Sequence, residues 1–475
     1  MNIKHSLIAA ALTTTLAATL APQAFAAGEA KNVIFFLGDG MGPVTITASR
    51  IWKYKEEGQL AMETLPYTAR VKTYSLDAQT TDSAPSMAAY MTGVKTRNDV
   101  LSMDGNTFAK APGKDATTGV SAAVDNCPAT GNGGPSTTLL ELAIAKGKAT
   151  GVISTARLTH ATPGATYAHS CHRDAEYNIA RQAVPGGAGA NAALGNGVDV
   201  MMGGVSNYWR PFDATTRPKG RPDGRDLVAE LQAKGYNFVS DLSGFNSLPT
   251  TGGTKVIGLY DFAIAQGHMS YELDRDPTKE PSLAQMASKS IDILSKNANG
   301  FFLMVEGGRI DHALHGTNAA RALADTIAFD DAIKAALDKM NTIDPGLANT
   351  LIVVTADHDH TMAFNGYGKR GSDPLGLSIN YANGAPNTDV NGNSYTTLVF
   401  GNGSNRVATR APLDAATVTN KDYLQEVAVR RGTPGSETHG GGDVMLFATG
   451  AASKTFKGTI DNTKVFTLVK NAAGY

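Results

Sequence analysis

Histidines and carboxylates gather in three short segments that lie far apart in this chain. The segments are residues 311–315 (DHALH), residues 357–360 (DHDH) and a lone His439. Of ten histidines, one lies near the N-terminus, and six of the other nine fall in these segments or in residues 159–163. Imidazole and carboxylate are typical ligands of zinc, and carboxylate and hydroxyl oxygens suit magnesium. The pattern predicts one metal site built from distant parts of the chain.

Ser83 is the candidate nucleophile beside that site. Residues 82–85 (DSAP) read as a turn that enters a helix, where free N–H groups and the positive dipole end favour an oxyanion or a phosphate. Asp and Ser are also ordinary helix caps, so this motif alone does not decide. No Gly-x-Ser-x-Gly elbow surrounds Ser83, which disfavours an α/β-hydrolase triad. Together with the metal clusters, the motif favours a metal-activated serine.

The spacing of the acidic residues and histidines indicates that they could bind the same metal ions. Asp311 and His315 are four residues apart, which on a helix places both side chains on one face. Asp357–His358 follows an apolar run, and Asp39 and Glu306 also end such runs. Each pair alone is equally well explained as an ordinary polar pair. Jointly they favour a metal, because buried carboxylates need compensation.

The elements that must position these residues alternate along the chain. Apolar runs at 33–37, 151–154, 301–305 and 351–354 predict strands that are buried on both faces. Between them we expect helices, one capped by Ser136 and running through Lys146, another over 317–340. This alternation predicts an α/β fold with a central, mostly parallel sheet flanked by helices on both faces. Such sheets bind ligands beyond the carboxyl ends of their strands.

Residues 1–26 are interpreted as a signal peptide. Lys4 is followed by an apolar stretch over 7–20 and by the small-x-small site at 24–26 (AFA). We therefore expect an exported protein, periplasmic or secreted, with one catalytic domain over 27–475. No later segment predicts a membrane span. The net charge of −1 gives no argument for nucleic acid or an anionic membrane as a partner.

Two loop-rich stretches and two cysteines complete the pattern. Residues 185–197 and 365–405 are rich in Gly, and the second is interpreted as part of an insertion over approximately 363–436, the crown segment, with short strands such as 396–400. Cys127 and Cys171 are the only cysteines. A disulfide between them is permitted in an exported protein, with two reduced thiols as the alternative.

The motifs resemble those of the alkaline phosphatase family. They occur in the family's order over nearly the whole mature chain, at 38–42 (GDGMG), 81–84 (TDSA), 159–163 (THATP), 305–312 (VEGGRIDH), 355–358 (TADH) and 437–440 (ETHG). Positions 160 and 312 are histidine, as in animal-type enzymes, whereas the best-known enterobacterial type carries Asp and Lys. Residues 364–372 resemble the animal-type insertion that forms a crown at the dimer interface.

The resemblance implies two zinc ions, one magnesium ion and a role for each matching residue. The first zinc takes Asp311, His315 and His439. The second zinc takes Asp39, Asp357 and His358. Magnesium takes Asp39, Thr162 and Glu306. Ser83 matches the nucleophile and Arg173 the phosphate clamp, although a surface salt bridge of Arg173 with Asp174 or Glu176 is an open alternative. The remaining histidines, expected near the phosphate or behind the ligands, are His160, His312 and His360.

The implied activity is hydrolysis of phosphate monoesters, with a broad substrate range, through a phosphoserine at Ser83. A related two-metal phosphodiesterase or sulfatase-type hydrolase is the nearest alternative, and a non-catalytic secreted metal-binding protein is a further one. The resemblance also implies a homodimer. An additional calcium ion near Asp261 and Glu280 is an expectation without a complete ligand set.

Overall fold

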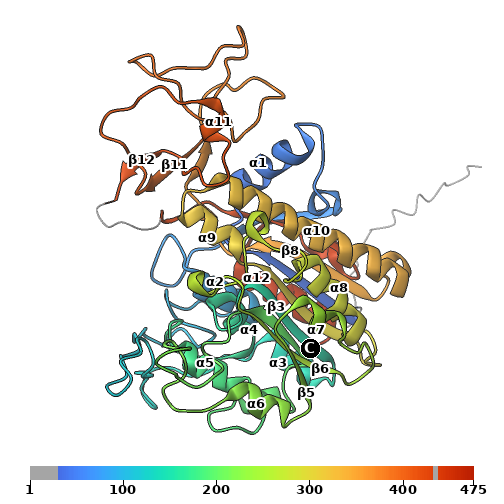
Figure 1. Cartoon of the computed structure of the whole chain (residues 1–475). Coiled ribbons are helices and arrows are strands. Elements are labelled where there is room, and N and C mark those ends of the chain that lie inside the picture. The colour runs from blue at the N-terminus through green and yellow to red at the C-terminus, as the bar shows by residue number, and fades with distance from the viewer. Residues whose placement is uncertain (1–29, 432–436) are drawn as a thin grey trace, which may run out of the picture.

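The computed structural model describes residues 30–431 and 437–475, so the predicted signal peptide at 1–26 lies outside the described residues. A ten-stranded sheet forms the centre of the molecule (Figure 1). In spatial order its strands are β15 (Gly458–Asp461), β2 (Tyr67–Lys72), β14 (Val444–Gly450), β8 (Thr350–Ala356), β1 (Asn32–Gly38), β7 (Phe301–Gly307), β3 (Ala149–Arg157), β4 (Val200–Gly204), β6 (Lys255–Tyr260) and β5 (Tyr236–Val239). Only β14 runs antiparallel to its neighbours, β2 and β8.

Helices cover the sheet on its two faces. One group packs around the long α10 and consists of α1 (Pro43–Tyr54), α8 (Leu283–Leu294), α9 (Arg309–His315) and α10 (Ala319–Ile343). The other group consists of α2 (Ser83–Thr92), α3 (Leu139–Ala145), α4 (Ala161–Tyr167) and α12 (Asn462–Ala473). Shorter helices are α5 (Glu176–Gln182), α6 (Leu227–Gln232), α7 (Leu242–Asn246) and α11 (Ala415–Val418). The predicted α/β fold with a mostly parallel sheet is confirmed.

The four apolar runs form the middle of this sheet. Every residue of β1, β7 and β8 is buried, as expected for parallel strands that are covered on both faces. The strands also end level, because Gly38 pairs with Gly307 on one side and with Ala356 on the other. The residues that follow β1 and β8, and the end of β7, therefore meet at one edge.

Element boundaries differ from the sequence expectations in several places. The predicted cap Ser136 is wrong: α3 is capped by Thr138, which forms a reciprocal pair of hydrogen bonds with Glu141. Helix α10 begins after Asn318 rather than at residue 317. The strand expected over 396–400 is β11 (Leu398–Gly403), and the loop 185–197 contains one short 3₁₀ turn, Ala192–Leu194.

The crown segment carries a small sheet of its own. Strand β11 pairs with β10 (Met362–Phe364) in antiparallel fashion and with β12 (Val427–Arg430) in parallel. This sheet lies apart from the main sheet, at the top of Figure 1. After it, β13 (His439–Gly440) pairs with β9 (Asp359–His360) and returns the chain to the edge of the main sheet.

Candidate metal centre and nucleophile

The site lies at the carboxyl edge of β1, β7 and β8. Asp39 follows β1, Glu306 is in β7, and Asp357 follows β8. Gly40 makes the turn after β1 with a φ of 67°, and its N–H donates to Asp357 Oδ1 at 3.0 Å. A Cβ atom there would lie 2.5 Å from the His360 ring, so the turn requires glycine.

Asp311, His315 and His439 converge in one group of potential ligands. Asp311 Oδ1 lies 3.3 Å from His315 Nε2 and 3.6 Å from His439 Nε2, and the two Nε2 atoms are 3.1 Å apart. The Nδ1 atoms of both rings face backbone carbonyls, those of Glu437 and Thr81. Each Nδ1 therefore donates, and two Nε2 lone pairs face each other. A cation between them removes that repulsion.

Asp39, Asp357 and His358 form a second group, next to Ser83. His358 Nε2 lies 3.2 Å from Asp39 Oδ1 and 3.5 Å from Asp357 Oδ2. Ser83 Oγ lies 3.3 Å from Asp39 Oδ1 and 3.2 Å from His358 Nε2. The hydroxyl of Ser83 is thus within reach of any ion held by this group.

The third group is rich in oxygen. Asp39, His160 and Glu306 offer atoms within 4.8 Å of one another, and Thr162 lies in the first turn of α4, which His160 precedes at the N-cap position. Among the described residues, Asp39 Oδ2, Thr162 Oγ1 and Glu306 Oε1 are buried without a hydrogen-bond partner. Oxygen donors of this kind suit magnesium.

Burial makes these carboxylates costly to ionise. Burial and the neighbouring Asp311 raise the pKa of Asp39 to about 7, and burial and Asp39 raise that of Asp357 to about 7. Burial raises the pKa of Glu306 well above its usual range. Divalent cations compensate such buried negative charge, so the donor set fits the metals that the sequence predicts.

His360 does not resemble a ligand, although it lies beside Asp311. Its Nε2 is 2.7 Å from Asp311 Oδ1, and its Nδ1 faces Glu437 Oε2. Burial opposes the charged form, but the hydrogen bonds with Asp311 and Glu437 raise the pKa of His360 to about 10. His360 is within 4.8 Å of the other potential ligands of the first group, but both of its ring nitrogens face carboxylate oxygens, a geometry in which each nitrogen donates and neither offers a lone pair to a metal.

Arg173 points into the site and not to the surface. Its guanidinium pairs with Asp82 through NH1, and its NH2 lies 3.0 Å from His160 Nε2. Among the described residues the ion-pair partner of Arg173 is Asp82, while Glu176 pairs with Arg157 and Asp174 lies near His172, so the alternative surface salt bridge is wrong. Asp82 does not cap α2 with its side chain, although it occupies the N-cap position. Sequence reasoning considered Asp82 only as a cap and missed its contact with Arg173.

One functional candidate was missed entirely. His268 is buried, and its ring lies 3.9 Å from that of His312 and 5.5 Å from that of His160, centroid to centroid. His268 lies in a Gly-containing loop outside the motif segments. Glu272 follows it at the same four-residue spacing as Asp311 and His315, and that spacing is a signal that could have found it.

Two further expectations have mixed outcomes. The disulfide between Cys127 and Cys171 is confirmed. Its second cysteine, Cys171, lies two residues before Arg173.

The expected calcium site near Asp261 and Glu280 lacks a ligand cluster. These two residues belong to none of the groups of three or more potential ligands in the described part of the chain. Asp261 accepts from Ser206 through both oxygens, and Glu280 Oε1 accepts from the Ser270 N–H.

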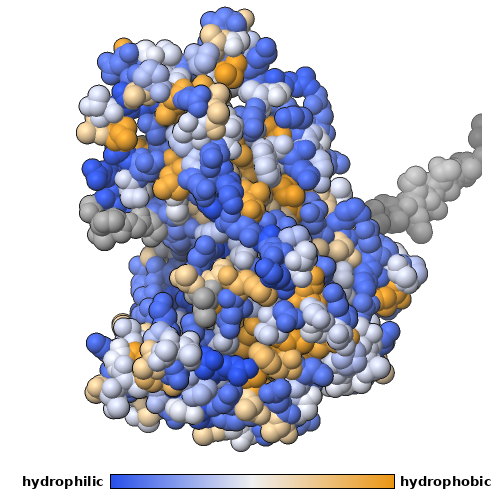
Figure 2. Space-filling model, in the orientation of Figure 1, coloured by the Kyte–Doolittle hydropathy of each residue, from blue (hydrophilic) through white to orange (hydrophobic). Residues whose placement is uncertain are grey.

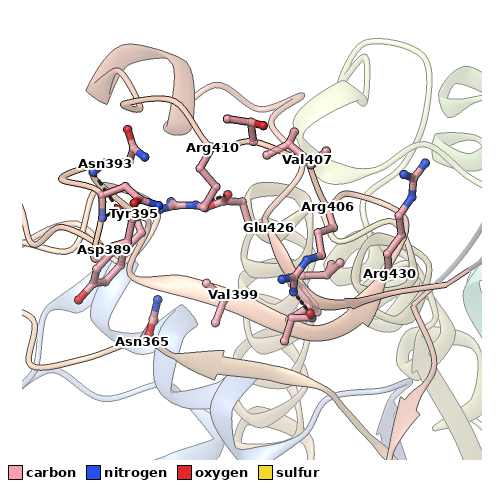
Figure 3. A pocket seen from close by; sticks show the side chains of 16 residues that line it. Asn365, Asp389, Asn393, Tyr395, Val399, Arg406, Val407, Arg410, Glu426 and Arg430 are labelled. Atoms are coloured by element: carbon pink, nitrogen blue, oxygen red, sulfur yellow. Dashed lines mark hydrogen bonds and ion pairs between the residues drawn. The ribbon is translucent and has the colours of Figure 1, made fainter.

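A separate cavity lies in the crown segment (Figure 3). Its volume is about 1170 Å³. Asp389 and Glu426 line it and pair with Arg410, as the dashed lines show. This cavity contains none of the site residues predicted from the sequence.

A buried cluster of histidines and carboxylates that could hold metal ions, beside a serine at a helix N-terminus and on the carboxyl edge of an α/β sheet, is the arrangement expected of a metal-dependent hydrolase. The family model for alkaline phosphatase matches residues 30–475. An alkaline phosphatase of Gadus morhua is 37% identical over 94% of this chain and 92% of its own. The tissue-nonspecific isozymes of Gallus gallus and Homo sapiens are 36% and 34% identical. The chain belongs to the alkaline phosphatase family.

Solved structures show the same fold. The Thermus thermophilus alkaline phosphatase matches with a TM-score of 0.65 at 23% identity, over 98% of this chain and 96% of its own. A variant of the enzyme from the Antarctic bacterium TAB5, with magnesium bound in its M3 site, matches with a TM-score of 0.64 at 22% identity, over 94% and 99% of the chains. The protein is an alkaline phosphatase, a phosphomonoesterase.

Proposed function

We propose that this enzyme hydrolyses phosphate monoesters through a covalent phosphoserine at Ser83. One observation carries the proposal: Ser83 Oγ lies within 3.3 Å of both Asp39 and His358, at the start of α2. Ser83 Oγ gives up its proton and bonds to phosphorus, the bond between phosphorus and the ester oxygen breaks, and that oxygen takes up one proton and leaves as the alcohol. Water then adds its OH to phosphorus and its other hydrogen to Oγ, so the bond between Oγ and phosphorus breaks and inorganic phosphate is released.

The residues at the edge of the sheet would hold two zinc ions and one magnesium ion. Asp311, His315 and His439 would hold the first zinc, and Asp39, Asp357 and His358 the second. Asp39, Thr162 and Glu306 would hold magnesium, which the magnesium-bound TAB5 variant supports. When bound, these metals supply positive charge that lowers the pKa of a nearby hydroxyl and stabilises a leaving oxygen. A calcium ion near Asp261 and Glu280 stays a weaker proposal.

Other side chains would bind and orient the phosphate. Arg173 carries N–H groups in a fork that matches two phosphate oxygens, and Asp82 holds that fork in place. His160 contacts Arg173 directly, so it shares in placing the guanidinium. Because these groups contact phosphorus and its oxygens and not the alcohol, we expect a broad substrate range.

We also propose a homodimer that is exported from the cytoplasm and that uses the crown segment, at approximately 363–436, as its contact. In the described part of that segment, Tyr367, Val390 and Val429 are 85%, 100% and 63% exposed. Hydrophobic residues are visible on this upper part of the molecule in Figure 2.

Export from the cytoplasm is supported by the disulfide, which suits an oxidising compartment. In the described part of the chain, no helix is both long and apolar enough to cross a membrane. Sedimentation of the purified protein tests the dimer.

The covalent route is tested by trapping. The zinc- and magnesium-loaded enzyme is mixed with a chromogenic phosphate monoester, quenched in acid and digested, and its peptides are analysed by mass spectrometry. We expect phosphate on Ser83 and release of the alcohol ahead of inorganic phosphate. Turnover without any phosphorylated Ser83 peptide, under conditions that preserve a phosphoserine standard, contradicts the covalent route.

A further inference from the structure

His268 joins the site from a loop that the sequence motifs do not include. The loop follows β6 and is held against β3 by a hydrogen bond from the Met269 N–H to the Thr155 carbonyl, 3.1 Å long. The His268 ring packs on the His312 ring and meets the His160 ring edge-on. The three imidazoles thus form a contiguous cluster behind the phosphate clamp.

Arg157 fixes the His268 ring. Nε2 of His268 lies 2.7 Å from Arg157 NH1, and Nδ1 lies 3.3 Å from the Arg157 backbone N–H. A guanidinium only donates, so Nε2 accepts, and because a neutral imidazole has a single acceptor nitrogen, Nδ1 carries the ring proton and its contact with the backbone N–H is not a hydrogen bond. Arg157 is itself held by Glu176 at 2.6 Å, and Glu176 also accepts from the Thr159 hydroxyl. The ring therefore rests on a partly buried ion pair.

His312 is fixed from its other side by Arg309. The guanidinium lies 3.2 Å from His312 Nδ1, and it is stacked 3.5 Å above the Tyr271 ring and buried. Since Arg309 can only donate, His312 Nδ1 accepts and the ring proton is on Nε2.

We propose that His268 is a positioning residue: with Arg309, it holds the neutral His312 ring so that its Nε2–H is preorganised as a donor for the phosphate group. His160 connects this donor to the clamp, because its ring lies 5.2 Å from that of His312 and its Nε2 contacts Arg173. A donor that is ordered before the phosphate arrives costs no reorganisation on binding. This inference rests on the proposed function.

The test is a double-mutant cycle of His268→Ala and His312→Ala, read out as Ki for inorganic phosphate and as kcat and KM for a chromogenic monoester. His268→Ala should raise Ki and KM by about tenfold, the loss of one hydrogen bond to a charged group, with a smaller change in kcat. In the His312→Ala background it should change neither constant further. Phe262→Ala, an exposed residue of the same loop, is the matched control and should stay within twofold of wild type.

Zinc and magnesium content should be unchanged in all variants. If His268→Ala does not fold, His268→Gln replaces it, since its amide oxygen still accepts from Arg157 but offers no ring to His312. Equal losses in both backgrounds, or an unchanged Ki, overturn the positioning role while the wild type remains active. A metal-loaded wild type that releases no phosphate overturns the proposed function itself.

Discussion

At the carboxyl edge of the main sheet, Asp39, Glu306 and Asp357 each keep one buried oxygen without a hydrogen-bond partner among the described residues, whereas in the crown segment Arg410 is paired with two carboxylates. The crown segment has an open cavity, yet the Arg410, Asp389 and Glu426 side chains that line it are paired with one another. The edge of the sheet has buried carboxylate oxygens without such partners. Buried groups that lack partners therefore locate the chemistry here better than cavity volume does.

The two regions also differ in how tightly they are built. The edge is formed by strands without an exposed residue, and its histidines are oriented by carbonyls of the backbone. The crown segment rests on a three-stranded sheet with exposed side chains on β12. A substitution at the edge should therefore change catalysis, and one in the crown segment should change stability or association.

Ser83→Ala should give the largest effect. Without the hydroxyl there is no covalent intermediate, and kcat should fall by about four orders of magnitude or more. Steady-state hydrolysis of a chromogenic monoester measures it. Thr92→Ala, at the other end of α2, is the matched control and should retain activity within about twofold, since its hydroxyl bonds only to Ala88 and to the Val94 N–H, away from the site. Full turnover by Ser83→Ala would end the nucleophile assignment.

Arg173→Ala should weaken phosphate binding without releasing the metals. Removing a charged donor that binds phosphate oxygens should raise Ki for inorganic phosphate by about 10- to 100-fold. Competition kinetics give Ki, and mass spectrometry gives the zinc content. Loss of zinc with an unchanged Ki would show that Arg173 supports the ligands and not the phosphate.

Asp325→Asn tests how a buried carboxyl group alone changes the pH dependence of stability. Asp325 is buried on α10 and belongs to none of the candidate metal groups of the described residues, so metal binding does not contribute to the result. Burial raises its pKa to about 8, from 3.8. Between these values the folded state holds a proton that the unfolded state releases, so stability falls as pH rises, by up to about 1.4 kcal/mol per pH unit. The variant cannot titrate there, so its thermal midpoint should fall less between pH 5 and about pH 8. Identical pH profiles would contradict the raised pKa.

Arg410→Ala should give the smallest effect. It leaves Asp389 and Glu426 without their common partner, but all three side chains are partly exposed, so the cost should be about 1 kcal/mol or less. The kcat/KM for a small monoester should stay within about twofold, because no site residue contacts this cavity. Thermal unfolding measures the loss of stability, and steady-state kinetics on the same preparation measure kcat/KM. A folded variant with greatly reduced kcat/KM would break the contrast between the two regions.

The sequence predicted the parts of the fold that repeat a simple physical pattern. The runs at 33–37, 301–305 and 351–354 are continuous apolar stretches, and they became β1, β7 and β8. Strand β2 and the crown strands are only half buried, and their mixed pattern gave weaker signals or boundaries that were off by a few residues. Three consecutive hydroxyl residues, Ser136, Thr137 and Thr138, precede α3, and only the reciprocal bonds with Glu141 select Thr138 as the cap.

The sequence predicted the site residues that lie in recognisable motifs. It missed the residues whose role depends on contacts with distant parts of the chain. The carboxylates and histidines at the edge of the sheet stand in recognisable segments, and all of them converge in the structure. Asp82 and His268 gain their partners, Arg173 and His312, from elements far away in the chain. No local spacing encodes such contacts.

Metal analysis coupled to activity tests the central claim most directly. The purified protein is stripped with a chelator, reloaded with zinc and magnesium, and assayed at each stage with a chromogenic phosphate monoester. The ligand sets predict about two zinc ions and one magnesium ion per chain, complete loss of hydrolysis on stripping and its return on reloading. Undiminished hydrolysis by protein shown to be free of metal would contradict the account.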